Sequence, residues 1–139
     1  PKSGEIVAGL RSGKIGPLRI GDKEKFADTL TMMKSFTGRG ILGLASRGNT
    51  VVGAVATNAK LTKAQATKVA QMAQDGFART IRPAHTMLDG DVIFALSTGA
   101  KRMDVSIIGA FAAEVMAQAI LRAVKTAKSA GGLPGLDEM

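Results

Sequence analysis

Thr50 is the residue whose type and position best suit covalent chemistry. It follows Asn49 and a polar, glycine-containing turn, and it begins the apolar run of residues 51–57. In a self-cleaving hydrolase, a hydroxyl at such a position attacks the preceding carbonyl and converts the peptide bond into an ester, which water then releases. The α-amine freed in this way has a pKa of about 7.7–8.0, so it can accept the hydroxyl proton without a histidine. A Thr at the start of a strand is also an ordinary structural residue, and position alone leaves both interpretations open.

A second group of polar residues precedes another apolar run, residues 92–98. Asp89 and Asp91 flank Gly90, a sequence that is typical of a tight turn, and on these residues alone the turn is favoured over a functional site. A calcium loop is excluded, because the later Asp or Asn ligand, the glycine and the distant Glu are missing. His85 lies just upstream. A lone loop histidine is more often structural than catalytic, and no nucleophile-elbow motif gives it a serine partner.

Composition excludes several kinds of site. The 139 residues hold no Cys and one His, so disulfides, Cys-ligated metals and multi-histidine metal sites are excluded, and no cofactor is expected. The net charge of +8 and the pI of 10.2 leave a basic nucleic-acid-binding protein as an alternative. The charges are dispersed, however, and the chain has no aromatic residues for stacking beyond five Phe that are mostly typical of a core, so no nucleic-acid partner is expected.

Neither a membrane partner nor secretion is expected. No apolar stretch approaches the roughly 20 residues of a membrane span, and no signal peptide opens the chain, so the expected location is cytoplasmic. The first residue is Pro1, which is not a translation start and suggests a processed chain or a fragment.

The first part of the chain predicts little regular structure. Glycines and Pro17 interrupt residues 1–20, which should form loops with short extended pieces. From Asp22 the apolar spacing of Phe26, Leu30 and Met33 predicts a helix that ends by Gly38.

The second part predicts strand, helix, strand and helix, hence an α+β fold. Residues 51–57 and 92–98 read as strands buried on both faces, the second ending at Gly99. A capping box of Thr62 and Gln65 begins the first helix, and Pro83 stops it.

The final helix is expected to lie deep in the fold. Asp104 should cap its start, Gly131 and Gly132 should end it, and its first four turns are apolar nearly all round. Two strands do not complete a sheet, and this helix has more apolar surface than one small face covers. The sequence therefore predicts an assembly with strands from elsewhere.

Three blocks, residues 48–59, 61–66 and 82–96, resemble the P1 family of self-processing peptidases and amidases. This family includes the D-aminopeptidase DmpA, the β-peptidyl aminopeptidases and the nylon-oligomer hydrolases. The resemblance extends over nearly all of residues 41–128. It implies an αββα sandwich of the DmpA and ornithine acetyltransferase type, of which this chain supplies only part of the sheets and helices.

The resemblance also implies the chemistry. The chain would cleave itself between Asn49 and Thr50, so that residues 1–49 end the α chain and residues 50–139 form a β chain with a loose tail from about residue 131. Thr50 would be the N-terminal nucleophile. Asp89 and Asp91 match the acidic pair beside the nucleophile of nylon hydrolases, and Asn58, in a recurring Thr-Asn pair, is a possible supporting residue. The implied substrate is a small peptide or amide.

Family members are much longer, and a Lys and an Asn that aid nucleophile activation and the oxyanion hole have no counterpart here. The resemblance therefore implies a remaining α-chain segment as partner and a homo-oligomer of αβ units. A non-catalytic subunit is the alternative within the same fold.

Overall fold

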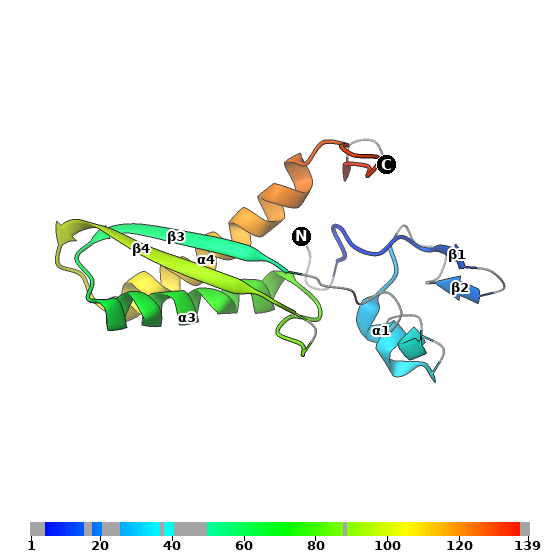
Figure 1. Cartoon of the computed structure of the whole chain (residues 1–139), viewed down its shortest axis with the longest axis horizontal. Helices are drawn as coiled ribbons and strands as arrows, with labels where there is room; N and C mark the ends of the chain where they lie inside the picture. Colours follow the sequence, from blue (N-terminus) through cyan, green and yellow to red (C-terminus); the bar gives the residue numbers. More distant parts are fainter. Residues whose placement is uncertain are drawn as a thin grey trace. The chain divides into compact units, whose positions relative to one another are not determined.

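The computed structural model describes residues 5–15, 18–20, 26–36, 38–40, 50–87 and 89–136. The chain divides into two compact units, one comprising Pro1–Arg47 with Arg122–Met139 and the other Gly48–Leu121 (Figure 1). The second unit carries the predicted site residues that the structure describes.

The first unit contains short elements. Strands β1 (Gly13–Ile15) and β2 (Leu18–Ile20) pair antiparallel, which confirms the predicted short extended pieces. Helix α1 (Thr29–Lys34) begins after Asp28, whose Oδ1 accepts a hydrogen bond from the Leu30 N–H at 2.9 Å. The predicted inclusion of Phe26 in a helix is wrong, because this residue forms an antiparallel bridge with Arg11. Residues 21–25 lie outside the described residues.

The second unit is built on two parallel strands joined through a helix. Strand β3 (Val52–Ala59) pairs with β4 (Val92–Lys101) in a register that runs from Val52↔Val92 to Thr57↔Ser97. Helix α3 (Lys63–Thr80) connects them, and α4 (Val105–Thr126) follows β4 (Figure 1). The mixed helix and strand content is consistent with the predicted α+β class.

Local capping signals set the starts of both long helices. The Thr62 hydroxyl accepts from the Gln65 N–H at 3.3 Å while the Gln65 side chain accepts from the Thr62 N–H at 2.9 Å, which confirms the capping box. Asp104 Oδ1 accepts from the Ser106 and Ile107 N–H groups at 2.8 and 3.1 Å, which confirms the predicted cap of α4. Helix α4 ends at Thr126, earlier than the predicted stop at Gly131 and Gly132.

The core lies between one face of the sheet and the two long helices. Its buried side chains come from α3, β4 and α4: Val69, Ala73, Phe77, Ile93, Ala112 and Met116. The helices approach closely at Gly76, where a Cβ atom would lie 2.7 Å from the Ala113 carbonyl oxygen. Glycine is therefore required at this crossing.

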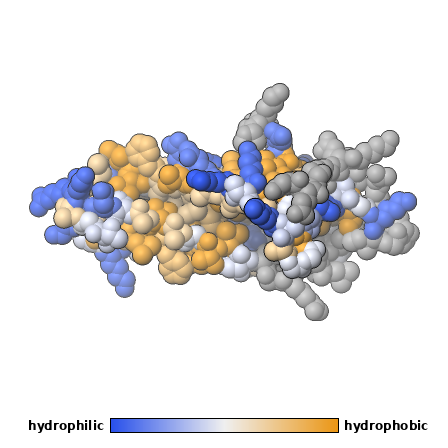
Figure 2. Space-filling model, turned by 90° about the horizontal axis from the view of Figure 1, so that it is seen from above, coloured by the Kyte–Doolittle hydropathy of each residue, from blue (hydrophilic) through white to orange (hydrophobic). Residues whose placement is uncertain are grey.

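The opposite face of the sheet is exposed, so the prediction of strands buried on both faces is wrong for the described chain. Val52, Phe94 and Leu96 are 66%, 57% and 49% exposed. Burial alternates along β3 because α3 and α4 cover one side only. Figure 2 shows hydrophobic side chains at the surface in the part of the picture where Figure 1 places this sheet and α4.

Two further expectations are corrected. Strand β4 continues past Gly99 to Lys101, because Gly99 lets its backbone approach Asn58 closely at an irregularity between Thr57 and Ala59. Helix α4 is not deep, since Phe111 and Val115 are more than half exposed. Its 22 residues are also long and apolar enough for a membrane span, contrary to the sequence reading, although the core helix of a soluble protein meets the same criteria.

Candidate functional site

Thr50 and Asp91 lie on neighbouring chain segments at one end of the sheet, which we call the Thr50 edge. Thr50 is exposed and immediately precedes β3. The N–H of the next residue, Val51, donates to Asp91 Oδ1 at 2.9 Å, and the Val51 carbonyl accepts from the Val92 N–H at 3.0 Å. These bonds fix the Asp91 carboxylate against the backbone one residue from the Thr50 hydroxyl.

The parallel topology explains why these residues meet. Thr50 precedes β3 and Asp91 precedes β4, and parallel neighbours begin at the same edge of a sheet. Helix α3 provides the crossover between the two strands. The structure thus brings together two of the three residues predicted as catalytic.

Asp89 stabilises the turn that leads into β4. Its Oδ2 accepts from the Thr86 N–H at 2.7 Å, and its own N–H donates to the Thr86 carbonyl at 3.2 Å. This reciprocal pair closes a tight turn two residues before Asp91. Asp89 therefore shapes the backbone that carries Asp91.

Asn58 lies near the other end of β3. It lies eight positions after Thr50 along the extended chain, a span of about 26 Å at 3.3 Å per residue. The structure does not bring Asn58 together with Thr50 within this chain, and its supporting role stays a prediction. Asn49 lies outside the described residues.

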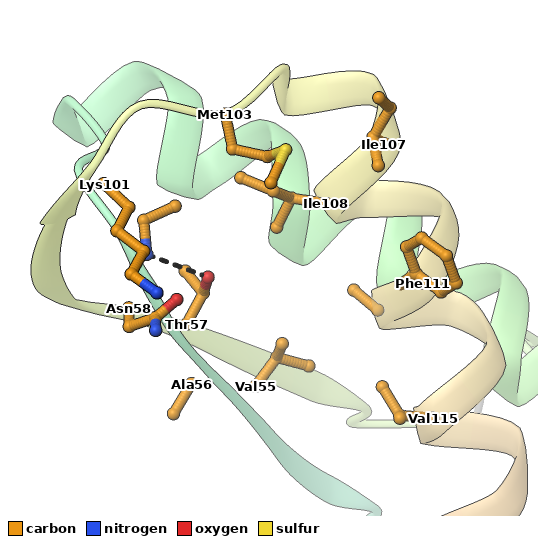
Figure 3. Close-up of a pocket in the computed structure, with 12 residues that line it drawn as sticks. Val55, Ala56, Thr57, Asn58, Lys101, Met103, Ile107, Ile108, Phe111 and Val115 are labelled. Atoms are coloured by element: carbon orange, nitrogen blue, oxygen red, sulfur yellow. Dashed lines mark hydrogen bonds between the residues drawn. The ribbon is translucent and has the colours of Figure 1, made fainter.

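The pocket beside Asn58 is distinct from the Thr50 edge. It has a volume of about 260 Å³ and lies between residues 55–59 of β3 and the apolar side chains of α4 (Figure 3). Ile107, Phe111 and Val115 line it from the helix, and Lys101 lies at the end near Asn58. Its walls are mainly apolar and offer no nucleophile–acid pair.

His85 belongs to the loop that carries the acids, although the hydrogen bond it makes reaches back to a helix. Its Nε2 lies 3.1 Å from Gln74 Oε1 of α3. The sequence places Gln74 on the polar side of its helix, and nothing there distinguishes it from other surface glutamines. Sequence reasoning therefore did not predict its contact with His85. Among the residues that the structure describes, no cluster of three or more His, Cys, Asp or Glu side chains could hold a metal ion.

The chain is similar to known proteins of one peptidase family. The model of Peptidase family S58 matches residues 7–137. An uncharacterized aminopeptidase, ML1167 of Mycobacterium leprae, is 48% identical over 101 residues, which cover 62% of this chain and 28% of that protein. The uncharacterized aminopeptidase Rv1333 of Mycobacterium tuberculosis is 41% identical over 106 residues, 66% of this chain and 31% of that protein.

A third relative is named for the hydrolysis of 6-aminohexanoate oligomers. The 6-aminohexanoate-oligomer endohydrolase of a Kocuria species is 34% identical over 91 residues, 56% of this chain and 26% of that protein. The chain thus spans about a third or less of the length of these curated relatives.

Proposed function

The chain belongs to Peptidase family S58, and on that premise we propose that it forms the nucleophile-bearing part of a self-cleaving amide hydrolase. The family predicted from residues 41–128 is confirmed, since the family model covers residues 7–137. The proposal of this activity is supported by the residues at the Thr50 edge and by the names of the relatives.

The first step is cleavage of the chain between Asn49 and Thr50. The Thr50 hydroxyl attacks the Asn49 carbonyl, the C–N bond breaks as the amine takes a proton, and an ester joins the two residues. Water hydrolyses that ester, leaving a carboxylate on Asn49 and a free α-amine on Thr50. Cleavage thereby creates the base that later turnover requires.

In turnover, the freed amine accepts the proton of the Thr50 hydroxyl, and Oγ attacks the amide carbonyl of the substrate. The leaving amine departs protonated, and water releases the acyl group from Thr50. A low pKa of the α-amine, about 7.7–8.0 in unperturbed chains, lets it act near neutral pH.

The Asp91–Val51 hydrogen bond is the single observation that carries this proposal. It holds a carboxylate beside Thr50, where the negative charge can orient the ammonium or hydroxyl of Thr50, or bind a substrate amine. Asp89 positions Asp91 through the turn with Thr86. Asn58 is assigned a supporting role at most, because it lies along β3 from this edge.

The proposed substrates are small peptides or amides. Aminopeptidase and oligomer endohydrolase are the names of the relatives, and both reactions break an amide bond. D-amino-acid peptides, β-peptides, simple amides and nylon-like oligomers all suit the proposed chemistry. A panel of these four classes would distinguish among them.

We also propose that this chain is part of an αββα sandwich. The exposed apolar face of β3 and β4 suits a second sheet, and the groove along residues 55–59 suits a further strand beside β3. The α-chain segment of the full-length protein would supply both, within a homo-oligomer of αβ units.

The test is a pair of substitutions at the nucleophile in the full-length protein. Thr50→Ala should leave one uncut chain without amide hydrolysis, whereas Thr50→Ser keeps a hydroxyl and should still cut and turn over. Cleavage or hydrolysis by Thr50→Ala, read by intact mass and product formation, would refute the assignment. A folded wild-type protein inactive on the whole panel would favour a non-catalytic subunit.

A further inference from the structure

The loop between α3 and β4 holds a residue in an unusual backbone conformation. His85 has a φ of 57° and is the one non-glycine residue with positive φ in the described part of the chain. A side-chain-bearing residue stays in this left-handed region only when its surroundings hold it there. His85 also makes a hydrogen bond to a side chain of α3.

The partner of His85 is Gln74, and the hydrogen bond between the two side chains is exposed. Gln74 lies in α3 between Ala73 and Phe77, both of which are fully buried in the core. Its Oε1 lies 3.1 Å from His85 Nε2, so the ring nitrogen is the donor. The contact joins the loop to a helix whose inner side is buried in the core.

A short series of hydrogen bonds leads from His85 to the Thr50 edge. The residue after His85, Thr86, exchanges two hydrogen bonds with Asp89, and Asp91 then accepts from the Val51 N–H at 2.9 Å. Displacement of His85 would move the start of the turn, and with it the carboxylate of Asp91.

We propose that Gln74 is a positioning residue for the reaction. By holding His85, it fixes the turn that places Asp91 against Val51 and therefore beside Thr50. The catalytic part of this inference rests on the proposed function; the structural part does not. Arg82 and Thr86 make further interactions in the same loop, so loss of the Gln74 contact loosens the loop without releasing it.

The experiment uses the full-length protein and two readouts. The first is kcat and KM for amide hydrolysis, together with the rate of self-cleavage. The second is the hydrogen-exchange rate of the Val51 amide, compared with that of the Met116 amide in the core. This rate can be measured whether or not the protein is active. Gln74→Ala removes the acceptor while keeping a good helix former, and Gln71→Ala is the matched control on the exposed side of α3.

Gln74→Ala should lower kcat and self-cleavage about three- to tenfold, the loss expected for one hydrogen bond, with KM within about twofold. Val51 exchange should accelerate by a similar factor, while Gln71→Ala matches wild type. Gln74→Glu keeps an acceptor and should restore both readouts. His85→Gly tolerates the positive φ, and combined with Gln74→Ala it should add nothing further.

Unchanged Val51 exchange in Gln74→Ala would overturn the inference, whatever the kinetics. Additive effects of Gln74→Ala and His85→Gly would also overturn it, because the two residues would then act separately. Should the wild-type protein neither cut itself nor hydrolyse an amide, the proposed function fails, and Val51 exchange still decides whether Gln74 positions Asp91.

Discussion

Among the single residues, Asp91 is the acid that bonds to the backbone next to Thr50. Its carboxylate accepts from the backbone N–H of Val51, forty positions away in sequence, in a partly buried environment. A carboxylate held in this way need not be ordered when substrate binds, which lowers the cost of reaching the reactive geometry. Asp89 bonds within the turn instead, so the proposed mechanism gives the two acids different roles.

Asp91→Asn should lower kcat by about 100-fold, because the neutral amide keeps a hydrogen-bond acceptor for Val51 but loses the charge beside Thr50. Steady-state kinetics on an amide substrate measures the loss, and the unfolding midpoint should stay close to wild type. Asp75→Asn, an exposed change on α3, is the matched control. Unchanged turnover in Asp91→Asn would reduce the acidic pair to a structural turn.

At the scale of elements, the sequence predicted features that depend on residues close together in the chain and missed those that depend on distant ones. The capping box of Thr62 and the Asp104 cap were predicted correctly, because each involves residues within three positions. The exposed face of the sheet and the exposed side of α4 were not predicted, because the burial of a face depends on which distant elements pack against it. Thr50 and Asp91 were predicted as a site through family resemblance, whereas their meeting follows from the parallel pairing of β3 with β4.

Gly76→Ala should destabilise the fold, although alanine is the better helix former. The added Cβ would lie 2.7 Å from the Ala113 carbonyl oxygen and from Met116 Cβ, so α3 and α4 would have to separate. We expect a loss of about 1–3 kcal/mol, as for other overpacked cores, which exceeds the gain in helix propensity. Urea unfolding of the full-length protein measures the loss.

Gly40→Ala provides the comparison, because a Cβ at Gly40 would meet nothing within 4 Å. This variant should be as stable as wild type or slightly more stable. Equal unfolding midpoints for Gly76→Ala and wild type would contradict the close crossing of α3 and α4.

At the scale of the whole molecule, the second unit has more apolar surface than it covers itself. The outer face of β3 and β4 and the exposed side of α4 are both apolar, and β3 pairs with no other strand in the described part of the chain. Contiguous exposed apolar surface of this kind marks an interface. The proposed sandwich places it against the α-chain segment.

Phe94→Lys should disrupt that interface, because a lysine there would be buried without a partner, at a cost of several kcal/mol. The two chains produced by self-cleavage should then separate on size exclusion, whereas the wild-type chains should elute together. Gln71→Lys adds the same charge on the exposed side of α3 and should leave co-elution unchanged. Co-elution of the Phe94→Lys chains would contradict a covered outer face.

The central claim is that Thr50 begins a chain of its own, with its α-amine as the base. The most direct measurement is the intact mass of the purified full-length protein, combined with N-terminal sequencing of the smaller chain. The expected result is two chains, the smaller beginning at Thr50. A single uncut chain that hydrolyses amides, or a cut at another bond, would contradict the claim.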